Sequence, residues 1–350
     1  MGDFSTYLSL FLFLFAGLII WIAGIELAKT TDTLDSRFKL GDALGGLILL
    51  GIATTLPEIA ILIAASLSGQ YTIILGNLIG GISVQTLAIV IFDFTLKGKR
   101  PLSYLAGSKI LCFEAIFVIF MTLVSIFGMR LPRNLNFHYF SPISVILIVA
   151  WVGGLYLLNR ARKRSELYQA EKDAQPGRMH HERRSQENHV FYAKKKTSYV
   201  IWIFALASLA TLIAGVMLEK TGSSVANHFG IGAGLFAGTI MALVTALPEI
   251  STGIESILIK DNQLAISDIF GGNSLMPALF IVADLISKKP ILPISQKSDI
   301  VFAVLGVALT LVYAISLVVK PKKRYFRLGA DSIVVIIIYA IGLFVLSRIG

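Results

Sequence analysis

The sequence predicts an all-α membrane protein of about ten transmembrane helices, built as two inverted repeats of five helices each. Three observations support this fold class: an apolar composition, apolar stretches of membrane-spanning length along the chain, and polar residues that recur at one constant offset. Hydrophobic residues occupy 55% of the 350 positions and charged residues only 15%. A soluble domain of this size does not bury so much apolar surface in one core.

The apolar stretches have the length that a bilayer requires. A helix needs about 20 residues to cross roughly 30 Å of hydrocarbon. We place ten segments at 6–28, 40–66, 72–96, 102–127, 141–158, 199–218, 228–259, 262–287, 298–319 and 330–347. No Lys or Arg precedes the first segment and no clear small-residue cleavage site follows it. We therefore interpret it as a retained helix and not as a secretory signal.

The basic residues fall mainly on one side of the predicted membrane. Of the 31 Lys and Arg residues, 24 lie in alternate loops: three at 29–39, four at 97–109, eleven at 160–196, one at 260 and five at 320–327. The positive-inside rule places these loops in the cytoplasm and both termini outside it. The net charge of +10 thus reflects topology and does not indicate nucleic-acid binding. Cys112 is the single cysteine, so no intramolecular disulfide and no cysteine metal cluster is expected.

The chain divides into three parts: an N-terminal five-helix repeat at 1–159, a cytoplasmic basic loop at 160–198 and a C-terminal five-helix repeat at 199–350. The loop is too polar to bury enough apolar area to fold alone. Because each half has an odd number of helices, the second copy is inverted relative to the first. An offset of 191 residues aligns Thr54-x-Leu56-Pro57-Glu58-Ile59 with Thr245-x-Leu247-Pro248-Glu249-Ile250, Gly80-Gly81 with Gly271-Gly272, and Asp93 with Asp284. Inverted repeats place substrate sites near the bilayer midplane, where the two copies meet.

Glu58 and Glu249 lie near the middle of their predicted spans. An ionisable side chain there costs several kcal/mol, so each acid is expected to face a cavity, a partner or an ion. Thr54, Thr55 and Thr245 share a helical face with these acids, since they precede them by three or four residues. The proline before each Glu lacks an N–H and leaves a backbone carbonyl unpaired four residues earlier. Carboxylate, hydroxyl and carbonyl oxygens are the ligands that hard cations prefer.

The third and eighth segments are expected to form the facing wall. Their glycines, Gly76, Gly80, Gly81, Gly271 and Gly272, let helix backbones approach closely. The polar residues that come next, Ser83, Gln85, Thr86, Asn273 and Ser274, are candidates to line a cavity. Asp93 and Asp284 stand about ten residues beyond the glycines and hence close to helix ends. We expect them to cap a helix or to lie at the interface, and not to bind an ion.

The two blocks together resemble the calcium:cation antiporter superfamily, to which the sodium/calcium exchangers belong. The matching residues are Ala53 to Glu58 with Gly76 to Gly80 in the first half, and Val244 to Glu249 with Gly271 to Asn273 in the second. The resemblance implies alternating access around a central group of ion sites. It implies Glu58 and Glu249 as the principal calcium ligands, with oxygens from Thr54, Thr55 and Thr245. Gln85 and Met276 stand where the family has its last polar ligands, and Met is no ligand for a hard cation.

The expected function is a secondary antiporter that exchanges Ca²⁺, or another divalent or monovalent cation, for Na⁺ or H⁺. Its partners are then inorganic cations and the lipid bilayer, with no permanently bound cofactor and no nucleic acid, and the sequence leaves the oligomeric state open. Glu58, Glu249, Thr54, Thr55, Thr245, Ser83, Gln85, Asn273 and Ser274 form the predicted site. A cation channel lined by the same acids is an alternative, although no carbonyl-rich filter sequence is evident. A membrane enzyme is a further alternative, but the spans hold no recognisable nucleophile or His-containing metal motif.

Overall fold

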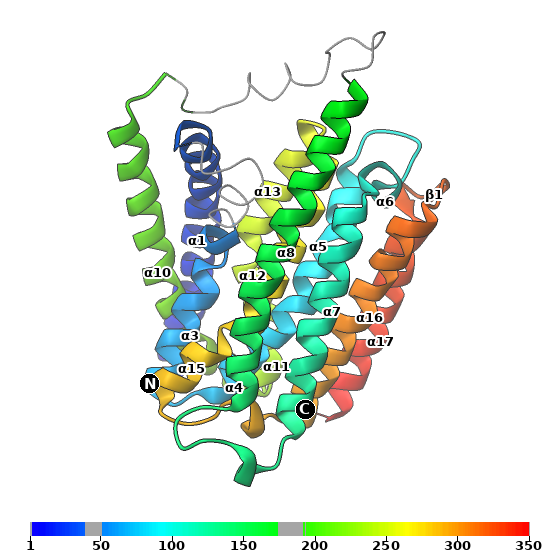
Figure 1. The fold of residues 1–350 in the computed structure, drawn as a ribbon. Coiled ribbons are helices and arrows are strands. Elements are labelled where there is room, and N and C mark those ends of the chain that lie inside the picture. Colours follow the sequence, from blue (N-terminus) through cyan, green and yellow to red (C-terminus); the bar gives the residue numbers. More distant parts are fainter. Residues whose placement is uncertain (1, 39–50, 174–191, 193, 350) are drawn as a thin grey trace.

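The computed structural model describes residues 2–38, 51–173, 192 and 194–349. They form one bundle of long helices that run roughly parallel to a common axis (Figure 1). Both ends of the chain lie at one end of the bundle, which we call the terminal side. The end of α8 (Pro142–Asp173) and the start of α10 (Thr197–His228) lie at the opposite end, which we call the loop side.

The helices of each half follow one another in the predicted order. The first half contains α1 (Gly2–Phe38), α3 (Leu56–Ser68), α4 (Tyr71–Leu75), the π-helical turn η1 (Gly76–Gly80), α5 (Gly81–Thr95), α6 (Leu102–Ala106), α7 (Lys109–Arg130), the 3₁₀ turn η2 (Arg133–Leu135) and α8. The second contains α10, α11 (Ala233–Phe236), the π-helical turn η3 (Ala237–Met241), α12 (Ala242–Thr245), α13 (Leu247–Leu258), α14 (Asn262–Ala278), α15 (Phe280–Ser287), the 3₁₀ turn η4 (Leu292–Ile294), α16 (Lys297–Val319) and α17 (Ala330–Ile349). A short antiparallel hairpin joins α16 to α17, and its two strands, β1 (Arg324–Tyr325) and β2 (Leu328–Gly329), have two residues each.

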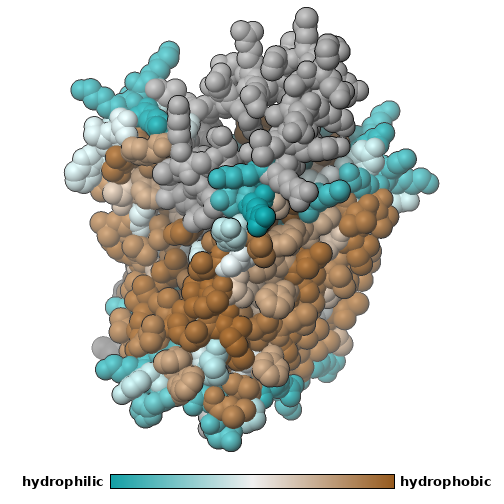
Figure 2. Space-filling view, in the orientation of Figure 1, coloured by the Kyte–Doolittle hydropathy of each residue, from teal (hydrophilic) through white to brown (hydrophobic). Residues whose placement is uncertain are grey.

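Eight helices among the described residues are long and apolar enough to cross a membrane. A ninth candidate is the bent pair of Ala233–Thr245 and Leu247–Leu258, whose two parts meet at 42°. The second predicted span, 40–66, is described only from residue 51, and its helix α3 is a shorter apolar one. The outer surface carries a broad apolar band with hydrophilic residues gathered toward the two ends (Figure 2). This band is the surface that lipid covers, because its exposed side chains include Phe120, Trp202 and Ile315.

Several boundaries differ from the prediction. The first segment, expected at 6–28, is the longer helix Gly2–Phe38. The fourth segment, expected as one helix at 102–127, breaks at Gly107; α7 then begins at Lys109, where the Ser108 hydroxyl accepts a hydrogen bond from the Leu111 N–H at 3.2 Å. The seventh segment was expected from residue 228, but α10 continues through His228 and the next helix starts at Ala233. The predicted loop at 160–198 is helical at both ends, since α8 continues to Asp173 and α10 begins at Thr197. Residues 174–191 and 193 of this loop lie outside the described chain.

The two halves cross at glycines in the centre of the bundle. A Cβ atom on Gly80 would lie 2.3 Å from the Gly238 Cα, and one on Gly76 would lie 2.2 Å from the Gly234 carbonyl oxygen. Side chains at these positions would force the two backbones apart, so the packing role predicted for Gly76 and Gly80 is confirmed. Their partners are the glycines around η3, whereas Gly272 has no other atom within 3.4 Å of its Cβ position. This close crossing holds η1 of the first half against η3 of the second half.

Candidate cation-binding site

Each Pro-Glu pair begins a new helix in the middle of the bundle. The preceding helical turns end at Thr55 and Ala246, and Pro57 and Pro248 lie in the first turns of α3 and α13. Proline is favoured there because its missing N–H would have no intrahelical acceptor. Helical bonding resumes with Ile59 N–H to the Thr55 carbonyl, at 3.1 Å, and with the equivalent bond in α13 at 2.9 Å. Glu58 and Glu249 therefore lie in the first turns of α3 and α13, where the positive end of the helix dipole stabilises a negative charge.

The two glutamates are buried together. Glu58 is 1% exposed and Glu249 is fully buried, and their carboxylates are close enough to repel each other. The threonines reach across the repeats: the Thr245 hydroxyl lies beside Glu58 and the Thr54 hydroxyl beside Glu249. Each hydroxyl also points to a carbonyl of its own helix, at 3.2 Å for Thr245 and 3.3 Å for Thr54. The inverted repeats thus build a reciprocal site, in which each half supplies an acid and a hydroxyl to the other.

Several oxygen atoms at this centre are buried without a hydrogen-bond donor among the described residues. They are Glu58 Oε2, both carboxylate oxygens of Glu249 and Gln85 Oε1, with Asn273 Oδ1 in the adjoining turn of α14. The other Glu58 oxygen accepts from Gln85 Nε2 at 3.2 Å. Gln85 Oε1 lies 3.5 Å from the Cβ position of Gly272, next to Asn273. Buried oxygens without partners are costly, and this set is the one that a hard cation satisfies.

The other predicted site residues have local partners. Thr55 donates to the Gly51 carbonyl at 2.5 Å and lies 3.9 Å from the Cβ position of Gly272. Ser83 donates to the Gly80 carbonyl at 2.7 Å and Ser274 to the Gly271 carbonyl at 2.8 Å. The Asn273 amide donates to the Thr86 hydroxyl at 3.0 Å and so joins α14 to α5. The hydroxyls of Ser83 and Ser274 therefore have backbone acceptors and retain only their lone pairs for another ligand.

Met276 and Gln85, which the 191-residue offset pairs, make equivalent contacts with different chemistry. The Met276 sulfur and methyl lie 3.2 Å from the Cβ position of Gly81, and Gln85 Oε1 stands over Gly272 in the same relation. Met276 fills the space with an apolar thioether, whereas Gln85 brings an amide to Glu58. At this one pair of positions, α5 therefore presents a polar side chain and α14 an apolar one.

Asp93 and Asp284 lie away from the glutamates and cap loops, as predicted. Asp93 accepts hydrogen bonds from the N–H groups of Leu102, at 2.8 Å, and Gly329, at 2.5 Å, and from the Ser332 hydroxyl at 2.9 Å. Arg324 lies 3.8 Å from it. Each hydrogen bond to a charged group contributes about 1.5 to 3 kcal/mol. Asp93 thereby ties the first half to the hairpin and final helix of the second.

Asp284 makes the corresponding connection in the other direction. It accepts from the N–H groups of Ile291, at 2.7 Å, and Ser141, at 3.0 Å, and from the Ser144 hydroxyl at 2.7 Å. Ser141 precedes α8, the last helix of the first half, and the same offset of 191 relates it to Ser332. Each repeat therefore holds the final helix of the other through one buried aspartate.

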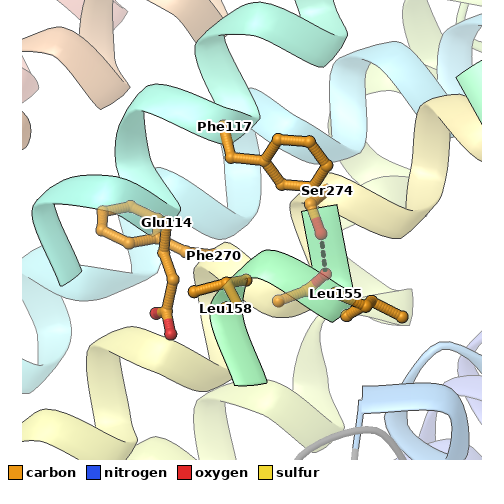
Figure 3. Close-up of a pocket in the computed structure, with 7 residues that line it drawn as sticks. Glu114, Phe117, Leu155, Leu158, Phe270 and Ser274 are labelled. Atoms are coloured by element: carbon orange, nitrogen blue, oxygen red, sulfur yellow. Dashed lines mark hydrogen bonds between the residues drawn. The ribbon is translucent and has the colours of Figure 1, made fainter. Parts of the chain in front are cut away.

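Glu114 and Asp268 are buried acids on the loop side that were not among the predicted site residues. Glu114 in α7 pairs with Arg162 and accepts from the Ser267 hydroxyl at 3.0 Å. It borders a small pocket between α7, α8 and α14 (Figure 3). Glu114 lies within a predicted span, the signal that singled out Glu58, but its partner Arg162 lies beyond the predicted end of the fifth segment. Asp268 in α14 accepts from the Thr252 hydroxyl at 2.6 Å.

The acids are spread along the bundle and not gathered at one point. Within the described ranges, no three His, Cys, Asp or Glu side chains lie close enough to share a metal ion. At the centre the carboxylates are two, so amide, hydroxyl and backbone oxygens must complete any coordination sphere.

Two facing repeats with paired buried acids define a membrane ion transporter of the exchanger class. The sequence pattern described as "Sodium/calcium exchanger protein" matches residues 8–159 and 199–348. The chain therefore belongs to the sodium/calcium exchanger family, within the calcium:cation antiporters. It is a membrane transporter of that family, and its fold is the two-repeat exchanger fold.

Individual relatives and solved structures agree with this family. The chain is 23% identical over 264 residues to "Inner membrane protein YrbG" of Escherichia coli (strain K12), covering 74% of each chain. It is 35% identical over 74 residues to "Putative antiporter CaxA" of Alkalimonas amylolytica, covering 21% of this chain and 23% of the other. The structure of an H⁺/Ca²⁺ exchanger, CAX, superimposes with a TM-score of 0.66 at 16% identity, over 97% of this chain and 87% of the other. The sodium-calcium exchanger NCX_Mj gives 0.60 at 14% identity, over 97% and 98%. These structural likenesses establish the fold.

Proposed function

We propose that the chain is a secondary antiporter that exchanges Ca²⁺ for Na⁺ or H⁺ by alternating access around Glu58 and Glu249. The observation that carries the proposal is the set of buried oxygens without donors at the crossing of the repeats. Glu58, Glu249, Gln85 and Asn273 supply these oxygens, and Thr54, Thr55 and Thr245 add hydroxyls from the adjoining helical turns. Ser83 and Ser274, whose hydroxyls donate to backbone carbonyls, border this set and contribute lone pairs. All are hard ligands of the kind that Ca²⁺ and Na⁺ take.

Charge balance favours exchange over one-way movement. Two bare carboxylates at the centre of the bilayer are costly, and bound cations or protons remove that cost. The empty carrier is therefore slow to reorient, and each reorientation carries an ion. With two carboxylates the site holds a formal charge of −2, which one Ca²⁺, two Na⁺ or two protons neutralise. We infer that the exchange is close to electroneutral.

The orientation rests on the distribution of basic residues. The loop side carries most of the Lys and Arg residues, so we place it in the cytoplasm and the termini outside. Inner-membrane placement of the E. coli relative fits a cell or inner membrane location for this chain.

Flux measurements in liposomes test the proposal. The purified protein is reconstituted in vesicles loaded with Na⁺, or held under a pH gradient, and the uptake of radiolabelled Ca²⁺ is followed. Saturable uptake that requires the opposing Na⁺ or H⁺ gradient supports the antiporter. Na⁺/H⁺ exchange without Ca²⁺ movement would make it a monovalent antiporter, an outcome for which the thioether of Met276 at an expected ligand position gives a reason. Unitary conductance steps in a planar bilayer would show that the protein is a cation channel and not an antiporter.

A further inference from the structure

The two Pro-Glu helices differ in the residues that lie beyond the glutamate. After Glu249, α13 runs toward the loop side with several polar residues, whereas after Glu58, α3 runs toward the terminal side and is apolar as far as Ala65 (Figure 1). At the same offset, Ser251, Thr252, Glu255 and Ser256 correspond to Ala60, Ile61, Ala64 and Ala65. Since an ion reaches a buried site along polar surface, the two approaches to the centre are chemically unequal.

The polar approach contains one further carboxylate close to the centre. Thr252 stands three residues beyond Glu249, and its hydroxyl donates to Asp268 at 2.6 Å. The same hydroxyl lies 3.0 Å from the Glu249 carbonyl, and the Asp268 carboxylate is close enough to repel that of Glu249. Asp268 is 4% exposed and Thr252 is 6% exposed, whereas Glu249 is fully buried. The three residues therefore form one buried polar group on the loop side of the central pair.

Glu249 brings unsatisfied carboxylate oxygens to this group. Both of its carboxylate oxygens are buried without a hydrogen-bond donor at bonding distance among the described residues. Asp268 adds another negative charge beside them, and no described Lys or Arg forms an ion pair with either acid. Two neighbouring carboxylates, one with unsatisfied oxygens, together with a threonine hydroxyl, are a fitting environment for a cation.

The equivalent place on the terminal side is neutral. Asn77 corresponds to Asp268 and Ile61 to Thr252. Asn77 is 1% exposed, and neither polar atom of its side chain has a hydrogen-bond partner among the described residues. Glu219 is a buried acid on this side, and its carboxylate accepts a hydrogen bond from the Ser68 hydroxyl at 2.6 Å. Ser68 follows Glu58 by ten residues, about 15 Å along the helix, so this acid lies near the end of the bundle.

We propose that Asp268, Thr252 and Glu249 form a second cation station on the loop side, without a counterpart on the terminal side. An ion entering from the loop side binds there before it reaches Glu58, while an ion from the terminal side meets only the neutral amide of Asn77 in the equivalent place. The station gives the loop side the higher apparent affinity for Ca²⁺. This inference rests on the proposed function, since it assigns a direction to the ion path of that exchanger.

The test compares Asp268→Asn, which gives the second repeat the residue of the first, with wild type. Half-saturating Ca²⁺ is measured for uptake into inside-out and right-side-out vesicles of known orientation. Loss of one carboxylate beside a divalent cation weakens binding by about tenfold or more. We expect that increase in half-saturating Ca²⁺ at the loop side only, with near-normal values in Asp268→Glu. Glu219→Gln, a buried acid away from the path, serves as the matched control and leaves the loop-side value unchanged.

Calorimetric titration of Ca²⁺ into the detergent-solubilised protein gives a readout that does not depend on transport. Asp268→Asn and the volume-conserving Thr252→Val should both weaken the measured affinity. If Asp268→Asn fails to fold, the Thr252→Val titration decides the matter. The proposed station would be overturned if the titrations showed unchanged Ca²⁺ affinity in these variants. It would also be overturned if half-saturating Ca²⁺ for vesicle uptake rose equally at the loop side and the terminal side. Absence of exchange in wild type would instead refute the proposed function, while the titration would still report on the station.

Discussion

Replacing Glu58 or Glu249 by Gln removes one negative charge from the centre and keeps the side-chain volume. In wild type, Glu58 presents one oxygen to Gln85 and leaves the other without a donor. A unit charge 4 Å from a divalent cation contributes about 8 kcal/mol at an effective dielectric constant of about 20. Relief of the repulsion between the two acids, and of the desolvation cost of one of them, offsets several kcal/mol of this. A net loss of about 3 kcal/mol remains, which corresponds to more than a hundredfold weaker Ca²⁺ binding.

The assay combines binding, flux and thermal stability. Titration calorimetry measures the affinity for Ca²⁺, and liposome uptake measures exchange. Without ions, both variants should melt at or above the wild-type temperature, because a buried unpaired charge has been removed. Addition of Ca²⁺ at 100 times its dissociation constant stabilises wild type by about 2.7 kcal/mol and should leave the variants unchanged.

Exchange and Ca²⁺ stabilisation at wild-type levels in both variants would refute the assignment of these acids as ion ligands. Loss of exchange together with a lowered melting temperature in the absence of ions would show a structural role instead. Glu219→Gln controls for the removal of any buried acid, since Glu219 bonds to Ser68 far from the centre.

The other predictions concern the packing, the aspartates, the coupling and the orientation. Gly80→Ala should lower the free energy of unfolding by about 1 to 3 kcal/mol, the usual cost of overpacking, because its Cβ would lie 2.3 Å from the Gly238 Cα. Gly272→Ala, with no contact under 3.5 Å, is the control and should leave the melting temperature unchanged. Asp284→Asn should destabilise by about 3 kcal/mol in the same melts, because its charged oxygens accept three hydrogen bonds; a melting temperature equal to wild type would contradict this. The ion gradient at which net Ca²⁺ flux vanishes should not move when valinomycin and K⁺ clamp the liposome voltage, whereas each uncompensated charge would contribute about 2.3 kcal/mol per 100 mV. A reporter at Gly177 should be cytoplasmic and one at Asn227 external, and finding both on one side would refute the orientation.

The sequence predicts the family, the helices and the central pair because their signals are local or repeated. Spans of about 20 apolar residues, and one offset that relates Glu58 to Glu249, need no knowledge of the fold. Partners that are distant along the chain leave no such signal. Glu114 meets Arg162 only because α8 continues beyond its apolar portion, where hydropathy no longer marks the helix. The break at Gly107 lies in an apolar run, so hydropathy gives no reason to divide it.

The departures from symmetry are likewise visible only in part. The sequence shows that Gln85 and Met276 stand where the family has its last polar ligands. The contact of Gln85 with Glu58, however, depends on how α5 packs in the folded protein. The repeat offset aligns Asp268 with Asn77. The hydrogen bond between Thr252 and Asp268 joins α13 to α14, and sequence spacing does not predict which side chains of these two helices meet. The distance of Asp93 and Asp284 from the glycines predicts their capping role, while the identity of the capped groups depends on the opposite repeat.

The crosswise hold of the two aspartates has a consequence for biosynthesis. Asp93 emerges from the ribosome with the first half, but two of its hydrogen-bond donors, Gly329 and Ser332, are made only with the hairpin and α17 of the second half. Domains usually complete their folding in the order of synthesis. Here the first half lacks these two donors for Asp93 until α17 of the second half is made, so neither half completes its contacts alone and a chain cut before α17 leaves the Asp93 site incomplete.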